Sequence, residues 1–135
     1  MKKIVKYLFL ALLIFTLGLL AKKYNLFDSV LLKKPKLSII DNTKDFGIIN
    51  KNDPGIVYFK FSNTGYSDLI ISNIETKCGC TITDWNKKPI KPNQVDSIRI
   101  EYDTNIIGPF NKPISIYSNS DINPIYLHII GIVKE

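Results

Sequence analysis

Two hydrophobic patterns divide this sequence of 135 residues. Near the N-terminus, an uncharged run that reads YLFLALLIFTLGLLA extends from Tyr7 to Ala21. From Leu37 onward, apolar and polar residues alternate with a period of two. An uninterrupted apolar run indicates a membrane or signal helix, whereas alternation is typical of strands that bury one face. The sequence therefore predicts an N-terminal helix followed by a β-domain.

The N-terminal run has the form of a secretory signal, because the basic stretch MKKIVK precedes the apolar residues. As a helix the run spans about 22 Å, and extending it back to Ile4 gives roughly 27 Å, close to the roughly 30 Å of a bilayer core. Ala21 suits the position before a cleavage site, but Leu19 is too large for the position two residues earlier. We therefore expect residues 1–21 to form an uncleaved signal-anchor, with a cleaved signal peptide as the alternative.

Residues 22–36 are predicted to be a basic linker beside the membrane. Tyr24, Phe27 and Leu31 share one helical face between lysines, which is typical of a short helix at the lipid headgroups that ends before Pro35. A flexible tether is the alternative. The expected partner of this segment is membrane lipid, contacted by the membrane-proximal lysines Lys22, Lys23, Lys33, Lys34 and Lys36.

Residues 37–135 are predicted to form an all-β domain. In three of its segments the apolar sets are Val57, Phe59 and Phe61; Ile98, Ile100 and Tyr102; and Ile125, Leu127 and Ile129. Turn sequences rich in Gly, Pro, Asn and Asp separate the segments. The expected strands are 37–41, 46–50, 55–62, 68–76, 79–85, 95–102, 111–118 and 124–133. Seven to eight short strands without a helix favour an antiparallel β-sandwich of two sheets over a barrel, and the last strand, apolar on both faces, is expected inside a sheet.

The charge of the chain is concentrated beside the apolar run. The net charge of +6 divides into +7 for residues 1–36 and −1 for residues 37–135. Binding to nucleic acid would need a basic face on the folded domain, so this class of function is not expected. The chain has one histidine, His128, and lacks a nucleophile elbow and a phosphate-binding loop, so we expect no enzyme.

A set of short motifs is spread over nearly the whole β-domain. They are Asp45–Ile49, Phe59–Gly65, Leu69, Cys78–Thr81, Trp85, Pro89–Pro92, Tyr102–Asp103, Gly108–Lys112, Ser118–Asn119 and Gly131. In these motifs the domain resembles a bacterial family known as domain of unknown function 1573, or DUF1573. The resemblance implies an immunoglobulin-like antiparallel β-sandwich in an exported or membrane-anchored protein, and it implies no activity. One departure is Asn93, where the family usually has glycine; asparagine tolerates left-handed backbone angles, so the turn is expected to survive.

Cys78 and Cys80 are the two cysteines of the chain and are separated by Gly79. On a regular strand their Cα atoms would lie about 6.6 Å apart, farther than the roughly 5.5–6 Å that a disulfide prefers. Gly79 is expected to let the chain bend and close the bond. So small a ring would be strained, and strained disulfides are the more easily reduced ones.

Three interpretations of the Cys-Gly-Cys pair stay open. The first is a structural site, either a local disulfide or two buried thiols. The second is a pair of soft thiolate ligands for Cu(I); zinc would need two further ligands that the sequence does not offer. The third is redox exchange with a partner thiol. We expect no cofactor on the first and third interpretations, and Cu(I) on the second.

The resulting hypothesis is a single-pass protein of the bacterial inner membrane, with its domain in the periplasm or otherwise outside the cytoplasm. If the signal is cleaved, the domain is secreted. The expected role is non-catalytic binding of an unknown envelope protein or glycan. The alternative is a Cu(I)-binding or redox protein that uses Cys78 and Cys80.

Overall fold

The computed structural model describes residues 2–31 and 34–135, which form two separate compact units. The first unit contains helix α1 (Lys2–Leu31), and the second extends from Lys34 to Glu135. The part Lys3–Tyr24 is long and apolar enough to cross a membrane. Its 22 residues correspond to about 33 Å of helix, a little more than a bilayer core of roughly 30 Å.

The helix does not end at Ala21, where the expected signal-anchor ends. It continues through Lys22 and Lys23 to Leu31, so the expected linker is helical, without a break, over its first two thirds. The physical reason is composition, since lysine is a good helix former and no proline occurs before Pro35. The end of the linker also differs from expectation, because Lys34, Pro35 and Lys36 belong to the β-domain.

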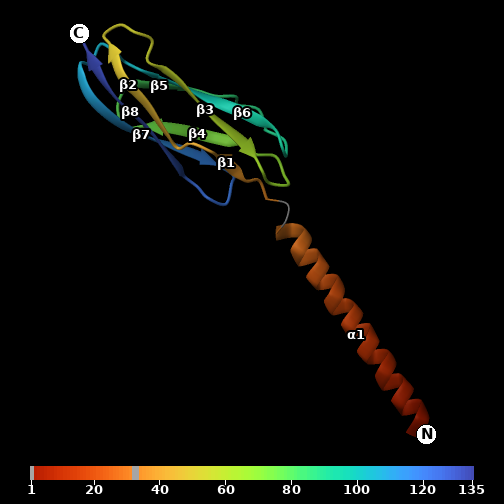
Figure 1. Cartoon of the computed structure of the whole chain (residues 1–135). Coiled ribbons are helices and arrows are strands. Elements are labelled where there is room, and N and C mark those ends of the chain that lie inside the picture. The colour runs from red at the N-terminus through yellow and green to blue at the C-terminus, as the bar shows by residue number, and fades with distance from the viewer. Residues whose placement is uncertain (1, 32–33) are drawn as a thin grey trace. The chain divides into compact units, whose positions relative to one another are not determined.

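The second unit is a sandwich of two four-stranded sheets (Figure 1). Sheet 1 has the order β1-β3-β6-β5 and sheet 2 the order β2-β8-β7-β4. The fold class predicted from alternation is therefore confirmed. The strands are β1 (Leu37–Ile39), β2 (Thr43–Asn50), β3 (Ile56–Asn63), β4 (Ile71–Thr76), β5 (Thr81–Asp84), β6 (Val95–Tyr102), β7 (Gly108–Ser118) and β8 (Ile125–Lys134).

One strand pair departs from the antiparallel arrangement. β2 pairs with β8 in parallel, with Thr43 opposite His128 and Asn50 opposite Lys134. A period-two pattern determines which face a residue occupies and says nothing about strand direction, so this pairing was not predictable from alternation. As expected, β8 lies inside a sheet, between β2 and β7.

The core lies between the two sheets and is built from the predicted alternating residues. Phe59, Phe61, Ile98, Ile100, Tyr102, Leu127 and Ile129 are buried, while Val57 and Ile125 are half-buried at its margin. β7 adds Phe110, Ile114 and Ile116 from the facing sheet. Each strand therefore presents one apolar face to the interior, which is the main stabilising term for a domain of this size.

Asn63, at the end of β3, is a fully buried polar residue with four side-chain hydrogen bonds. Its Oδ1 accepts from the backbone N–H groups of Lys36 and Gly65, at 3.2 and 3.0 Å. Its Nδ2 donates to the carbonyl oxygens of Ser67 and Ile90, at 2.7 and 2.9 Å. One side chain thus joins the start of the domain, the turn after β3 and the segment before β6.

We call this end of the sandwich, with Lys34–Leu37, the 64–67 turn and the 91–94 turn, the tether end. Gly65 packs so closely here that a Cβ atom would overlap the backbone of residues 34–36. Asn93 adopts the left-handed conformation with φ of 64°, which confirms that asparagine supports the turn in place of glycine.

Replacing Asn63 with alanine is expected to destabilise the domain by about 3 kcal/mol or more, because it leaves several buried backbone groups without partners. Denaturant unfolding of the full chain in detergent micelles, followed by fluorescence of the single tryptophan, measures the effect. The matched control is Asn73→Ala on the exposed face of β4, where a change within about 0.5 kcal/mol is expected. Equal losses for the two variants would contradict the role of Asn63.

Candidate functional site

Cys78, Gly79 and Cys80 form the turn that carries the chain from β4 in sheet 2 to β5 in sheet 1. The sequence placed this segment in a strand beginning at residue 79, but β5 begins at Thr81. The turn brings the two Cα atoms to 5.3 Å, and the two Sγ atoms are joined as a disulfide. Both cysteines are half-buried, and Cys80 packs against the core.

Gly79 lies exposed between the two cysteines. Its backbone is not among the positive-φ glycines, and a Cβ atom built on it would meet nothing within 4 Å beyond its chain neighbours. Crowding therefore does not require glycine here, and its expected role in bending the chain stays a prediction.

Hydrogen bonds also hold the turn, independently of the sulfur atoms. Asp103 donates its backbone N–H to the carbonyl oxygen of Cys80 at 2.9 Å, and the Thr76 hydroxyl donates to the carbonyl oxygen of Cys78 at 3.1 Å. Thr81, buried at 6% exposure, pairs with Tyr102 across the β5–β6 ladder. Its hydroxyl lies 3.9 Å from the Sγ atom of each cysteine.

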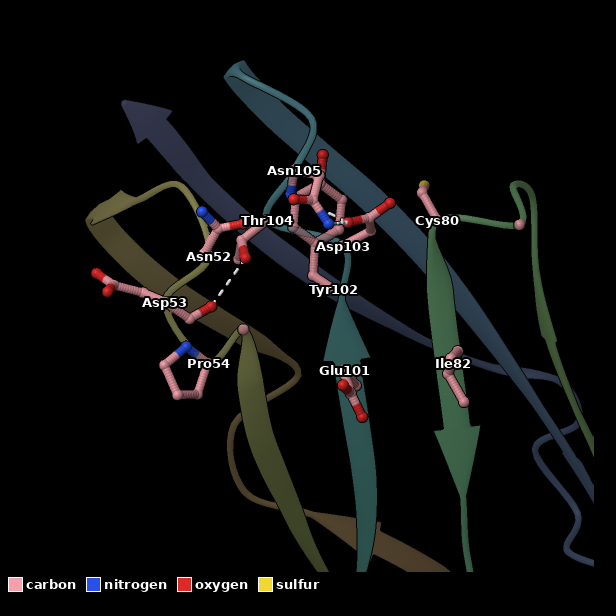
Figure 2. A pocket seen from close by; sticks show the side chains of 12 residues that line it. Asn52, Asp53, Pro54, Cys80, Ile82, Glu101, Tyr102, Asp103, Thr104 and Asn105 are labelled. Carbon is pink, nitrogen blue, oxygen red and sulfur yellow. Dashed lines mark hydrogen bonds between the residues drawn. The ribbon is translucent and has the colours of Figure 1, made fainter. Parts of the chain in front are cut away.

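A cleft of about 440 Å³ opens beside Cys80 (Figure 2). Three turns line it: the turn before β3, the turn before β5 and the turn after β6. We call this part of the sandwich the cleft end. It is opposite the tether end, because β3 and β6 each extend from one end to the other. The lining residues are Asn52, Asp53, Pro54, Gly55, Gly79, Cys80, Ile82, Glu101, Tyr102, Asp103, Thr104 and Asn105.

The cleft is acidic, since its lining includes Asp53, Glu101 and Asp103 and no lysine or arginine. Each carboxylate also has a local partner. Asp53 accepts from the backbone N–H of Asn50 at 2.9 Å, and Asp103 accepts from that of Asn105 at 3.0 Å. Glu101 forms an ion pair with Arg99 at 2.7 Å. Asp53 and Asp103 therefore shape their turns, Glu101 is held on β6, and all three carboxylates give the cleft a negative charge.

Tyr102 lines the bottom of the cleft and is not a reactive group. Its ring is buried and stacks on Phe110 with 3.9 Å between the ring centroids. Burial raises the pKa of the Tyr102 phenol above its ordinary value, and the nearby negative charge of Asp103 raises it further. The phenol therefore stays neutral at pH 7. The Thr104 hydroxyl, also buried, donates to the backbone carbonyl of Asp53 at 2.8 Å and joins two of the lining turns.

The remaining candidate residues lie apart from this cleft. His128 is in β8, with Nδ1 3.3 Å from the side-chain oxygen of Asn111. Trp85 follows β5 and donates its indole N–H to the carbonyl oxygen of Ile71 at 3.3 Å. Among the described residues, no three His, Cys, Asp or Glu side chains gather as a metal site. Cu(I) would thus have only the two sulfur atoms of the reduced pair, and its binding stays a prediction.

The membrane-proximal lysines are divided between the two units. Lys22 and Lys23 are exposed on α1. Lys34 and Lys36 are exposed at the tether end, where Lys34 forms an ion pair with Asp121 at 2.9 Å. Lys33 lies outside the described residues. Their contact with lipid stays a prediction.

The sandwich has an immunoglobulin-like fold. Similar solved structures include a protein of unknown function from Porphyromonas gingivalis W83, with a TM-score of 0.68 and 15% identity over 75% of this chain and 48% of that one. PapD-like domain 7 of human CEP192 has a TM-score of 0.65 and 8% identity over 76% of this chain and 88% of that one. The VesB protease of Vibrio cholerae has a TM-score of 0.57 and 9% identity over 81% of this chain and 35% of that one.

These likenesses show a shared fold alone, since all are well below 25% identity. The chain spans about half the length of the Porphyromonas protein. None of the curated proteins matches this chain in sequence. The family model for proteins of unknown function DUF1573 matches residues 37–133. The chain therefore belongs to the DUF1573 family, as its motifs indicated.

The geometry of the turn predicts that the disulfide contributes little to folding stability. The bond links residues two apart, and closing so short a loop stabilises by about 2 kcal/mol at most in the chain-entropy model. The double variant Cys78→Ser, Cys80→Ser should therefore fold and unfold within about 2 kcal/mol of the wild type. Denaturant unfolding of both in detergent micelles measures the difference, with reduced wild-type protein as the control. A domain that fails to fold without the bond would contradict this account.

Proposed function

We propose that this chain is a non-catalytic binding module, tethered to the bacterial inner membrane by α1 and exposed on its extracytoplasmic side. The observation that carries the proposal is the position of the cleft. It lies at the end of the sandwich opposite the residues through which the tether enters the domain. The cleft and the residues at which the chain enters the domain are therefore separate surfaces of the sandwich.

Separate observations support the membrane tether and the extracytoplasmic location of the domain. The apolar part of α1 matches a bilayer in length and follows basic residues, as a signal-anchor does. The side chains of Lys3–Tyr24 are exposed, which suits an environment of lipid. A disulfide persists in oxidising compartments such as the bacterial periplasm and not in the cytosol, so the joined Cys78–Cys80 pair favours the extracytoplasmic side.

The cleft end offers the features of a site for an extended protein segment. β5 is an edge strand of sheet 1, so among the residues that the structure describes no strand pairs with its outer side in the sheet. Such an edge can accept a further strand from a partner. Ile82, on β5 at the border of the cleft, is 61% exposed and supplies an apolar contact. The acidic lining favours a neutral or basic segment.

The same lining supports a role in binding rather than catalysis. The carboxylates of Asp53, Glu101 and Asp103 have partners within or beside their own turns, and the phenol of Tyr102 is buried under the cleft. A general acid or base needs a free titratable group within reach of a substrate. The side chains around this cleft instead bond to neighbouring groups of the domain and so define the shape of its surface.

Photo-crosslinking in intact cells tests this proposal. A photoreactive amino acid replaces Ile82 at the cleft end in one variant and Tyr66, 71% exposed at the tether end, in a matched control. The expected result is a discrete protein adduct from position 82, at least fivefold more abundant than any adduct from position 66. An adduct sensitive to glycan hydrolases and resistant to protease would identify a glycan partner instead. Equal adducts from both positions, or none from position 82, would contradict the proposal.

A further inference from the structure

We propose that the Cys78–Cys80 disulfide is an exchangeable redox bond, reduced and re-formed by a protein dithiol that docks at the cleft end, and that the Thr81 hydroxyl stabilises the thiolate released. This inference deepens the proposed function and rests on it, because it names the chemistry of the partner. The observation behind it is the position of the pair, at an open turn beside a cleft and next to a buried hydroxyl group.

The disulfide can be reached from solvent. Both cysteines are only half-buried, and Cys80 forms part of the cleft wall. Gly79 is exposed between them and has no neighbour within 4 Å of its would-be Cβ apart from the cysteines themselves. Structural disulfides resist reduction, whereas exposed ones are typically labile or regulatory. Because neither cysteine is fully buried and Cys80 lines the cleft, a dithiol that docks there has access to the pair.

When the disulfide is reduced, hydrogen bonds that do not involve sulfur still hold the turn. The hydrogen bonds from Asp103 to Cys80 and from Thr76 to Cys78 involve backbone carbonyl oxygens and not sulfur. The pairing of Thr81 with Tyr102 continues the sheet directly after the turn. Both redox states can therefore share one fold, which is the condition for a bond that opens and closes repeatedly.

Thr81 has the position required to act on the reduced form. Its side chain is buried, and its hydroxyl oxygen lies equally close to both sulfur atoms, at 3.9 Å. A hydroxyl that donates to a thiolate favours the charged form of the cysteine. The negative charges of Glu101 and Asp103 in the cleft oppose this effect. Thr81 is accordingly a positioning residue for the leaving thiolate.

The exchange proceeds in two balanced steps. A thiolate of the partner attacks one sulfur of the pair, forms an intermolecular disulfide and releases the other sulfur as a thiolate, which takes up a proton. The second thiolate of the partner then attacks its own half of the intermolecular disulfide and frees the remaining cysteine as a thiol. Two electrons and two protons pass to this chain, and the partner becomes oxidised. The reverse sequence restores the Cys78–Cys80 bond.

The partner must supply both electrons, because this chain contains two cysteines and no other thiol to donate them. A vicinal dithiol protein meets this requirement, since its second thiol resolves the intermolecular bond. Because the cleft is acidic, the segment of the partner that docks there is expected to be neutral or basic.

The first test uses the full chain in detergent micelles, with dithiothreitol as the dithiol probe. Samples are equilibrated at graded ratios of reduced and oxidised dithiothreitol, quenched in acid and alkylated, and their thiols are counted by mass spectrometry. The expected result is a reversible change between zero and two thiols per chain, while tryptophan fluorescence remains native. A pair that is reduced only when denaturant unfolds the domain would overturn the proposal.

The second test concerns Thr81 and follows alkylation of the reduced chain by iodoacetamide against pH. Thr81→Val removes the hydroxyl at nearly constant volume and is expected to slow alkylation at pH 7 by threefold or more, with the profile moved to higher pH. Thr81→Ser keeps a hydroxyl and should restore the wild-type profile. Identical profiles for all three proteins would overturn the role of Thr81 in stabilising the thiolate.

The two proposals fail in distinguishable ways. The double Cys→Ser variant carrying the photoreactive residue at position 82 reports binding without redox chemistry. If its adduct persists while the wild-type pair resists dithiothreitol, the module binds but does not exchange. If the pair exchanges readily and position 82 gives no adduct in cells, the proposed binding at the cleft end is wrong.

Discussion

The buried side chain of Asn63 is the interaction on which the arrangement of this domain depends. Buried amides are costly unless every donor and acceptor is paired, and here Oδ1 and Nδ2 each have two backbone partners. These bonds connect the chain at Lys36 with the turn after β3 and with the segment before β6. The tether end is therefore closed by hydrogen bonds from a single side chain. The opposite end is left to three turns, and those turns enclose the cleft beside the cysteine pair.

The strands were predictable because burial imposes a period of two. Phe59, Ile98 and Leu127 were placed on the core by alternation alone, and all three are fully buried. The pattern carries no information on strand direction, so the parallel pairing of β2 with β8 was not foreseen. The helix continues past Ala21 because the lysines that follow end the hydrophobic run but are themselves good helix formers.

The candidate site could be predicted only in part from the sequence. The cysteine pair is visible at once, and its spacing suggested a small ring. The cleft is not visible, because its walls come from turns around residues 53, 80 and 103 that meet only through strand pairing. Thr81 was missed for a similar reason, since nothing local distinguishes it from other strand threonines. A hydroxyl between two sulfur atoms is a property of the folded turn.

The central claim is that an anchored chain displays a solvent-accessible cysteine pair outside the cytoplasmic membrane. Labelling in intact cells tests it most directly, using a reductant and a maleimide that do not cross that membrane. The account predicts two labels per chain after the reductant is added, on protein that remains in the membrane fraction. Labels that appear only after the membrane is opened would contradict the location. Labels that require denaturant would contradict the accessibility of Cys78 and Cys80.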